Sequence, residues 1–142
     1  MLLALDMDDR GITMSDRPIN RYERKYLDRA QSQERKQRLE QLLAEVGSPD
    51  ERSRAQAVRS LCPCRGPWPD SVWQHIAAAC QDPSPIVRLQ ALHVLEDTHG
   101  RPHPNAYRLL RKACQDPDPR VARSAADYIR QFRLREIRKQ NV

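Results

Sequence analysis

The feature that most constrains this chain is a fourteen-residue pattern that occurs three times at a constant spacing. The copies are SPDERSRAQAVRSL (48–61), DPSPIVRLQALHVL (82–95) and DPDPRVARSAADYI (116–129). Each copy starts 34 residues after the previous one, with no insertion or deletion. A fixed period of this length is typical of repeat proteins, in which similar units stack on their neighbours. The period therefore predicts an array of small helical units.

Each copy carries the signals of a helix and of its first turn. The third column holds side chains able to cap a helix N-terminus, and the fourth holds first-turn residues. In chain order these are Asp50, Ser84 and Asp118, followed by Glu51, Pro85 and Pro119. The tenth column is alanine in every copy, which predicts the close approach of a neighbouring helix. We expect a helix from about the fourth column of each copy.

The period also extends backwards from each copy. Residues 72–82 align with residues 106–116. The positions 34 residues before residues 73, 76, 79 and 80 hold Leu39, Leu42, Glu45 and Val46. Each unit is therefore expected to contain a first helix, a short turn and a second helix. The turn makes the two helices antiparallel, and stacked pairs bury a core that one pair cannot bury alone.

The second helix resembles that of the HEAT and HEAT-like (armadillo-type) repeats. That family carries the pattern D-x-x-P-x-V-R-x-x-A-x-x-x-L, which the middle copy meets with Asp82, Pro85, Val87, Arg88, Ala91 and Leu95. The third copy has Ala122 in place of the arginine, and the first has Ser48, Glu51 and Ser53 in place of the aspartate, proline and valine. The resemblance covers residues 34–132. It implies an all-α fold, a short α-solenoid of three HEAT-like antiparallel helix pairs with an N-terminal capping helix. It also implies that Arg54 and Arg88 pair with a turn aspartate, Asp82 or Asp116.

The segments outside the repeats complete the expected organisation. We expect a flexible N-terminal arm (1–17) and a single repeat domain (18–139), with repeats at about 35–62, 69–96 and 103–130 and a C-terminal cap at 131–139. Apolar residues three and four apart predict a short amphipathic capping helix; they are Ile19, Tyr22, Tyr26 and Ala30. The wholly polar residues 31–38 are either a loop or an exposed section of a continuous helix.

The C-terminal segment, Arg130 to Val142, is rich in arginine and leaves two interpretations open. If the last helix continues, Ile129, Phe132 and Ile137 close the end of the core and the arginines face water. The alternative is a basic tail that contacts nucleic acid or an acidic partner.

The cysteines raise the question of a metal site. Cys62 and Cys64 could join His75, His99 or His103 around zinc. The C-x-C spacing, with no second ligand pair, favours a structural interpretation, in which Cys62 ends its helix and Cys64 packs under the loop. The prolines and glycine of residues 62–69 are expected to exclude regular structure there. Cys80 and Cys114 share a repeat column with Val46 and are expected to be small buried side chains. We therefore expect no metal and no cofactor.

Several function classes are disfavoured by the motifs. The chain has no glycine-rich phosphate loop, H-E-x-x-H or G-x-S-x-G motif, so we expect no enzymatic activity and infer no small-molecule substrate. It has no apolar run of about 20 residues, and MLLAL lacks the basic region that precedes the apolar core of a signal peptide. A cytoplasmic protein with reduced thiols and no membrane contact is the expectation.

Binding to a macromolecule is the function that the pattern favours. In such solenoids the second helices tend to line the concave surface. The candidate partner-binding residues on that face are Arg52, Arg59, Ile86, Leu89, His93, Arg120, Arg123 and Arg130. Three repeat columns are expected to face solvent: Arg52/Ile86/Arg120, Arg59/His93/Asp127 and Ala55/Leu89/Arg123. Basic ends around an apolar centre are typical of a protein partner, which predicts a non-enzymatic scaffold. The alternative, given a net charge of +6, is a nucleic-acid-binding module that uses the arginine-rich surface and the basic C-terminus.

Overall fold

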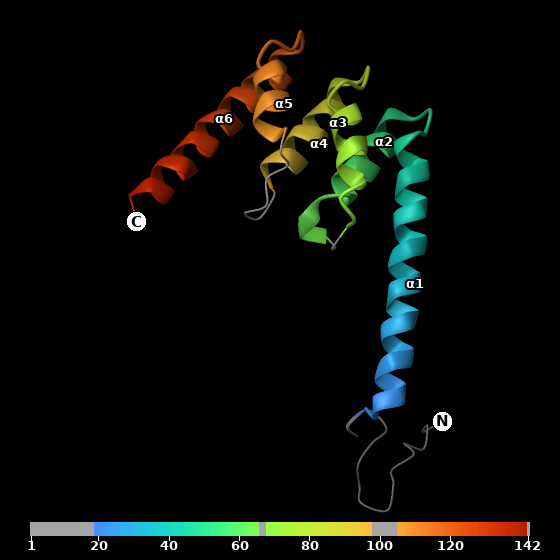
Figure 1. The fold of residues 1–142 in the computed structure, drawn as a ribbon. Helices are drawn as coiled ribbons and strands as arrows, with labels where there is room; N and C mark the ends of the chain where they lie inside the picture. The colour runs from blue at the N-terminus through green and yellow to red at the C-terminus, as the bar shows by residue number, and fades with distance from the viewer. Residues whose placement is uncertain (1–18, 66–67, 98–104, 142) are drawn as a thin grey trace, which may run out of the picture. The chain divides into compact units, whose positions relative to one another are not determined.

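The computed structural model describes residues 19–65, 68–97 and 105–141, and the regular structure in these segments is helical (Figure 1). The elements are α1 (Arg21–Val46), α2 (Glu51–Ser60), the 3-10 helix η1 (Pro63–Arg65), α3 (Val72–Ala79), α4 (Pro85–Glu96), α5 (Ala106–Ala113) and α6 (Pro119–Gln140). The expected arm at residues 1–17 lies outside the described residues, as do His99 and His103.

The chain divides into two units, Met1–Gln37 and Arg38–Val142, and the boundary falls within α1. The polar residues 31–38 are helical, so they are the exposed section of a continuous helix and not a loop. The expected short capping helix is part of α1. Two residues of its expected apolar face, Tyr22 and Tyr26, are 85% and 72% exposed.

The second unit is built from helix pairs that share one core. The last turns of α1 precede α2, α3 packs on α4, and α5 packs on α6 (Figure 1). The central helix is α4, which also packs against α2 and α6. Ala57, Ala91 and Ala125 are all 0% exposed, as expected for a column where a second helix approaches closely. The predicted short all-α solenoid is confirmed.

Two of the three predicted N-caps form. The side chain of Asp50 accepts a hydrogen bond from the backbone N–H of Ser53, and that of Asp118 accepts one from Arg120. Ser84 makes no such cap; its Oγ instead donates to Glu51 Oε2 at 2.7 Å. Hydrogen bonds to a carboxylate are strong, and this buried hydroxyl links the start of α4 to the start of α2.

The predicted pairing of the repeat arginines with turn aspartates is confirmed. Nε and Nη2 of Arg54 donate to the two carboxylate oxygens of Asp82, both at 3.0 Å. Arg88 binds Asp116 in the same way, at 2.8 and 2.9 Å. In both cases Nη1 donates to two backbone carbonyls of the arginine's own turn, for example to those of Asp82 and Pro83 from Arg88. These bidentate pairs link each repeat to the next.

The same pairs shift the acidity of the aspartates. Burial alone would raise the pKa of Asp82 and of Asp116. The hydrogen bonds from Arg54 and Arg88, the backbone N–H groups of Ser84 and Asp118 and the positive charge of the arginines together outweigh that cost, and the pKa of each carboxyl lies below its ordinary value of 3.8. Both arginines therefore have a structural role and are engaged within the protein.

Candidate interaction surface and cysteine cluster

The eight candidate partner-binding residues lie on three consecutive second helices. Arg52 and Arg59 are on α2, Ile86, Leu89 and His93 on α4, and Arg120, Arg123 and Arg130 on α6. All five arginines are exposed, Ile86 is 36% exposed, and Leu89 and His93 are half-buried. Because α4 packs on both α2 and α6, the apolar members lie on the middle helix.

One of the three columns expected to face solvent does not do so throughout. Ala55 is only 6% exposed and belongs to the core, and Leu89 packs against the core from its edge. Arg123, the third member, is exposed. The expectation was wrong for Ala55. Helix α4 packs on α2, whereas no described helix follows α6.

The arginines on this face differ in how far they are engaged. Arg120 pairs with Asp118 at 3.0 Å, and Arg130 pairs with Asp127 at 3.5 Å across one helical turn. The hydrogen bond from Arg120 lowers the pKa of Asp118 to about 2. Arg59 and Arg123 make no side-chain hydrogen bond or ion pair with any residue that the structure describes. Their guanidinium groups are therefore available to a partner.

The C-terminal part of α6 is only partly covered. Phe132 lies against Tyr107, with ring centroids 5.7 Å apart, and Arg133 donates to the Tyr107 hydroxyl at 3.3 Å. The helix continues to Gln140, and Ile129 packs on the core. Ile137, which was expected to help close the core, is 53% exposed.

The pair Cys62 and Cys64 lies just after the C-terminal end of α2. Cys62 is 1% exposed and its Sγ is 2.8 Å from Sγ of Cys64. Cys64 is exposed, so the expectation that it packs under the loop was wrong. The segment was expected to lack regular structure, but Pro63–Arg65 forms η1. In this turn the N–H of Arg65 donates to the carbonyl of Cys62 at 2.9 Å, which places Cys64 on the outside.

A carboxylate joins the two thiols. Oδ2 of Asp97, the residue that ends α4, lies 3.4 Å from Cys62 Sγ. Burial and then the contact with Cys64 raise the pKa of the Cys62 thiol to about 12. The described histidine among the expected partners, His75, is not part of this cluster. The sequence interpretation missed Asp97, although the 34-residue period places it one repeat beyond Pro63.

Cys80 and Cys114 are half-buried and pack against the core. Burial raises the pKa of Cys80 to about 12. They were expected to be buried; they pack on the core but are covered only in part.

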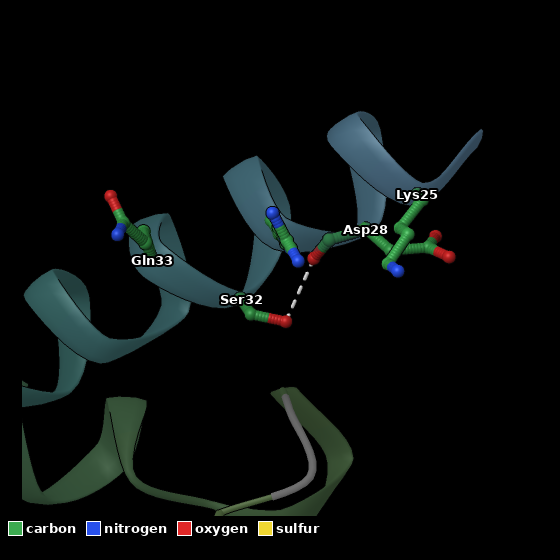
Figure 2. Close-up of a pocket in the computed structure, with 5 residues that line it drawn as sticks. Lys25, Asp28, Ser32 and Gln33 are labelled. Carbon is green, nitrogen blue, oxygen red and sulfur yellow. Dashed lines mark hydrogen bonds between the residues drawn. The ribbon is translucent and has the colours of Figure 1, made fainter. Parts of the chain in front are cut away.

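A shallow hollow on α1 offers little for binding (Figure 2). Its lining residues are Lys25, Asp28, Arg29, Ser32 and Gln33, all exposed and all from one helix. The hydroxyl of Ser32 donates to the carbonyl of Asp28 at 2.8 Å, as the dashed line shows. Since a single helix supplies the lining, we assign no site to it.

Stacked antiparallel helix pairs linked by arginine–aspartate pairs define a helical-repeat protein. The family model described as HEAT repeats matches residues 73–138, from α3 into α6. Residues 73–138 thus match the HEAT-like repeat family, and HEAT repeats generally mediate protein–protein interaction. Searches of curated proteins and of solved structures gave no match. Within the described ranges, no helix has the length and apolar character needed to cross a membrane.

Proposed function

We propose that the chain is a non-enzymatic scaffold that binds another protein through the second-helix face formed by α2, α4 and α6. The observation that carries the proposal is the distribution of side chains on this face. Exposed arginines of α2 and α6 flank Ile86, Leu89 and His93 of α4. An apolar centre with a polar rim is the usual anatomy of a protein interface.

The charges on this face indicate the chemistry of the partner. Arg54 and Arg88 are engaged by aspartates within the repeats, whereas Arg59 and Arg123 have no described partner. Arginine binds carboxylates through a planar, bidentate contact. The proposed partner therefore presents acidic side chains around an apolar anchor that contacts Ile86. A cytoplasmic location belongs to the same proposal, because four free cysteines suit a reducing compartment.

The test starts from the full chain, immobilised and exposed to nuclease-treated native lysate. Captured proteins are identified by mass spectrometry, and binding is then measured between the purified chain and the purified partner. We expect Arg59→Glu/Arg123→Glu and Ile86→Asp each to weaken binding by at least tenfold, or about 1.4 kcal/mol. The matched control is Arg108→Glu/Arg111→Glu, two exposed arginines on the first helix α5, which we expect to change binding by less than about twofold.

Each variant is first shown to be folded by circular dichroism and thermal unfolding. Equal loss in the second-helix variants and in the α5 control would contradict the assignment of the face. If the chain instead binds nucleic acid, with an affinity that falls steeply as salt rises, the nucleic-acid alternative replaces the scaffold.

A further inference from the structure

The cluster of Cys62, Cys64 and Asp97 has no part in the proposed partner-binding face. It lies at the C-terminal ends of α2 and α4, and one ligand atom from each residue lies within 4.8 Å of the other two. We propose that these three residues bind one Zn²⁺ ion, which links the first repeat to the second. This is a property additional to protein binding.

One distance between donor atoms is close to the value that zinc requires, and the other needs a small movement of an exposed side chain. With Zn–S near 2.3 Å and Zn–O near 2.1 Å, a tetrahedral ion holds sulfur and oxygen ligands about 3.6 Å apart and two sulfurs about 3.8 Å apart. Cys62 Sγ and Asp97 Oδ2 are 3.4 Å apart. The two Sγ atoms, at 2.8 Å, must separate by about 1 Å to meet this geometry. Cys64 is exposed, so its side chain is free to rotate by that amount.

The backbone fixes the position of the buried ligand. The N–H of Cys62 donates to the carbonyl of Arg59 at 3.2 Å. Its own carbonyl accepts from the N–H of Arg65 at 2.9 Å and from Nε1 of Trp68 at 3.3 Å. On the other side, the N–H of Asp97 donates to the carbonyl of His93 at 3.0 Å, which ends α4. Two ligands therefore come from well-defined helix ends, the arrangement that metal sites need.

The donor set selects the type of ion. Two thiols with one carboxylate favour a thiophilic ion such as Zn²⁺ and disfavour Mg²⁺ and Ca²⁺, which take oxygen ligands. Three protein ligands leave a fourth tetrahedral position for water or a further ligand. The exposed Cys64 provides the route by which the ion enters from solvent.

The location gives the ion a structural consequence. At their N-terminal ends, α2 and α4 are linked through Arg54 and Asp82 and through Glu51 and Ser84. A zinc ion at their C-terminal ends would link the same two helices a second time. The first and second repeats would then be held at both ends, as the second and third are by Arg88 with Asp116 and by Arg135 with Glu96.

The experiment uses the full chain, reduced and freed of metal, with Zn²⁺ as the probe. We expect one zinc ion per chain by elemental analysis after gel filtration. In parallel, Co²⁺ should give the near-ultraviolet thiolate-to-metal absorption of a tetrahedral thiolate site. Zinc should also protect Cys62 and Cys64 from alkylation, mapped by mass spectrometry, while the reactivity of Cys80 and Cys114 stays unchanged.

Variants separate the site from adventitious binding. Cys64→Ser and Asp97→Asn should each weaken zinc affinity by more than the 10- to 100-fold typical of losing an outer-shell partner. The matched control, Cys80→Ala/Cys114→Ala, should bind as the wild type does. Unchanged affinity in Cys64→Ser, or loss of binding in the control, would overturn the proposal. So would a Cys62–Cys64 disulfide in protein prepared without reductant, if the reduced chain then takes up no zinc. We expect Cys64→Ser to lose zinc binding but to bind the protein partner as the wild type does. A failure of the zinc proposal can therefore be distinguished from a failure of the scaffold proposal.

Discussion

The two ends of helices α2 and α4 are built on different principles. At their N-terminal ends the same contact occurs twice, Arg54 with Asp82 and Arg88 with Asp116, each across 28 residues. At their C-terminal ends Cys62, Cys64 and Asp97 form a cluster that has no second copy among the described residues. A contact that recurs with the 34-residue period links successive repeats and so has a structural role. A cluster that occurs once is a candidate for a specific task.

The largest expected effect concerns the recurring contact. In Arg88→Met the Asp116 carboxylate, whose side chain is 9% exposed, loses its bidentate partner. Breaking such a largely buried pair leaves a poorly solvated charge, so we expect the free energy of unfolding to fall by about 2 to 3 kcal/mol. Urea denaturation measures this loss. A change below about 0.5 kcal/mol, as for a surface substitution, would show that the pair contributes little.

The same pairs predict a dependence on pH. Because the pKa values of Asp82 and Asp116 lie below 3.8 in the folded chain, the stabilisation is present above that value. It is lost as the pH falls through the lowered folded pKa. Wild-type stability should therefore fall as the pH drops below about 4, and Arg88→Met should show a flatter profile. Parallel profiles would mean that Asp116 is not the group that titrates.

The buried hydroxyl at the same end should have a smaller effect. Ser84→Ala removes the hydrogen bond to Glu51, which is exposed and regains water, so we expect a loss of about 1 kcal/mol. Ser124→Ala is the matched control, because Ser124 makes no side-chain hydrogen bond with any described residue. Thermal unfolding of both variants side by side decides whether this link contributes.

The smallest effect belongs to the cysteine cluster without metal. Since Cys64 is exposed, Cys64→Ser should change stability by less than about 0.5 kcal/mol in zinc-free buffer. Zinc should then raise the melting temperature of the wild type and leave that of the variant unchanged. Equal responses of the two proteins would remove the proposed difference between the two ends.

The repeating parts of the molecule were predictable from the sequence because the period makes every column visible three times. The helices and the buried alanines follow from these columns, and the pairing of Arg54 and Arg88 with aspartates was implied by the resemblance to the HEAT repeats. The sequence did not decide between a loop and a helix at residues 31–38, because a polar segment has no apolar period. Its glutamines, glutamate, arginines and lysine are nevertheless good helix formers.

The non-repeating contacts were harder to predict. Ser84 has the residue type of an N-cap, but its hydroxyl is oriented as a donor toward the carboxylate of Glu51 and accepts no bond from the start of α4. The prolines around Cys64 indicated a segment without regular structure. Residues 63–65 nevertheless form one 3-10 turn, and Cys64 is exposed on it. Asp97 joins the cysteines only because stacked repeats bring residues one period apart together. Aligning the loop after α2 with the loop after α4 by the 34-residue period would have identified Asp97 as a neighbour of the cysteines.

The constant spacing of the arginine pairs also makes the array extensible. A segment such as residues 82–115 contains both an acceptor for the previous repeat, Asp82, and a donor for the next, Arg88. Inserting a second copy of that segment after residue 115 would reproduce each link without any new design. The surface formed by the second helices could then be lengthened by one helix pair at a time.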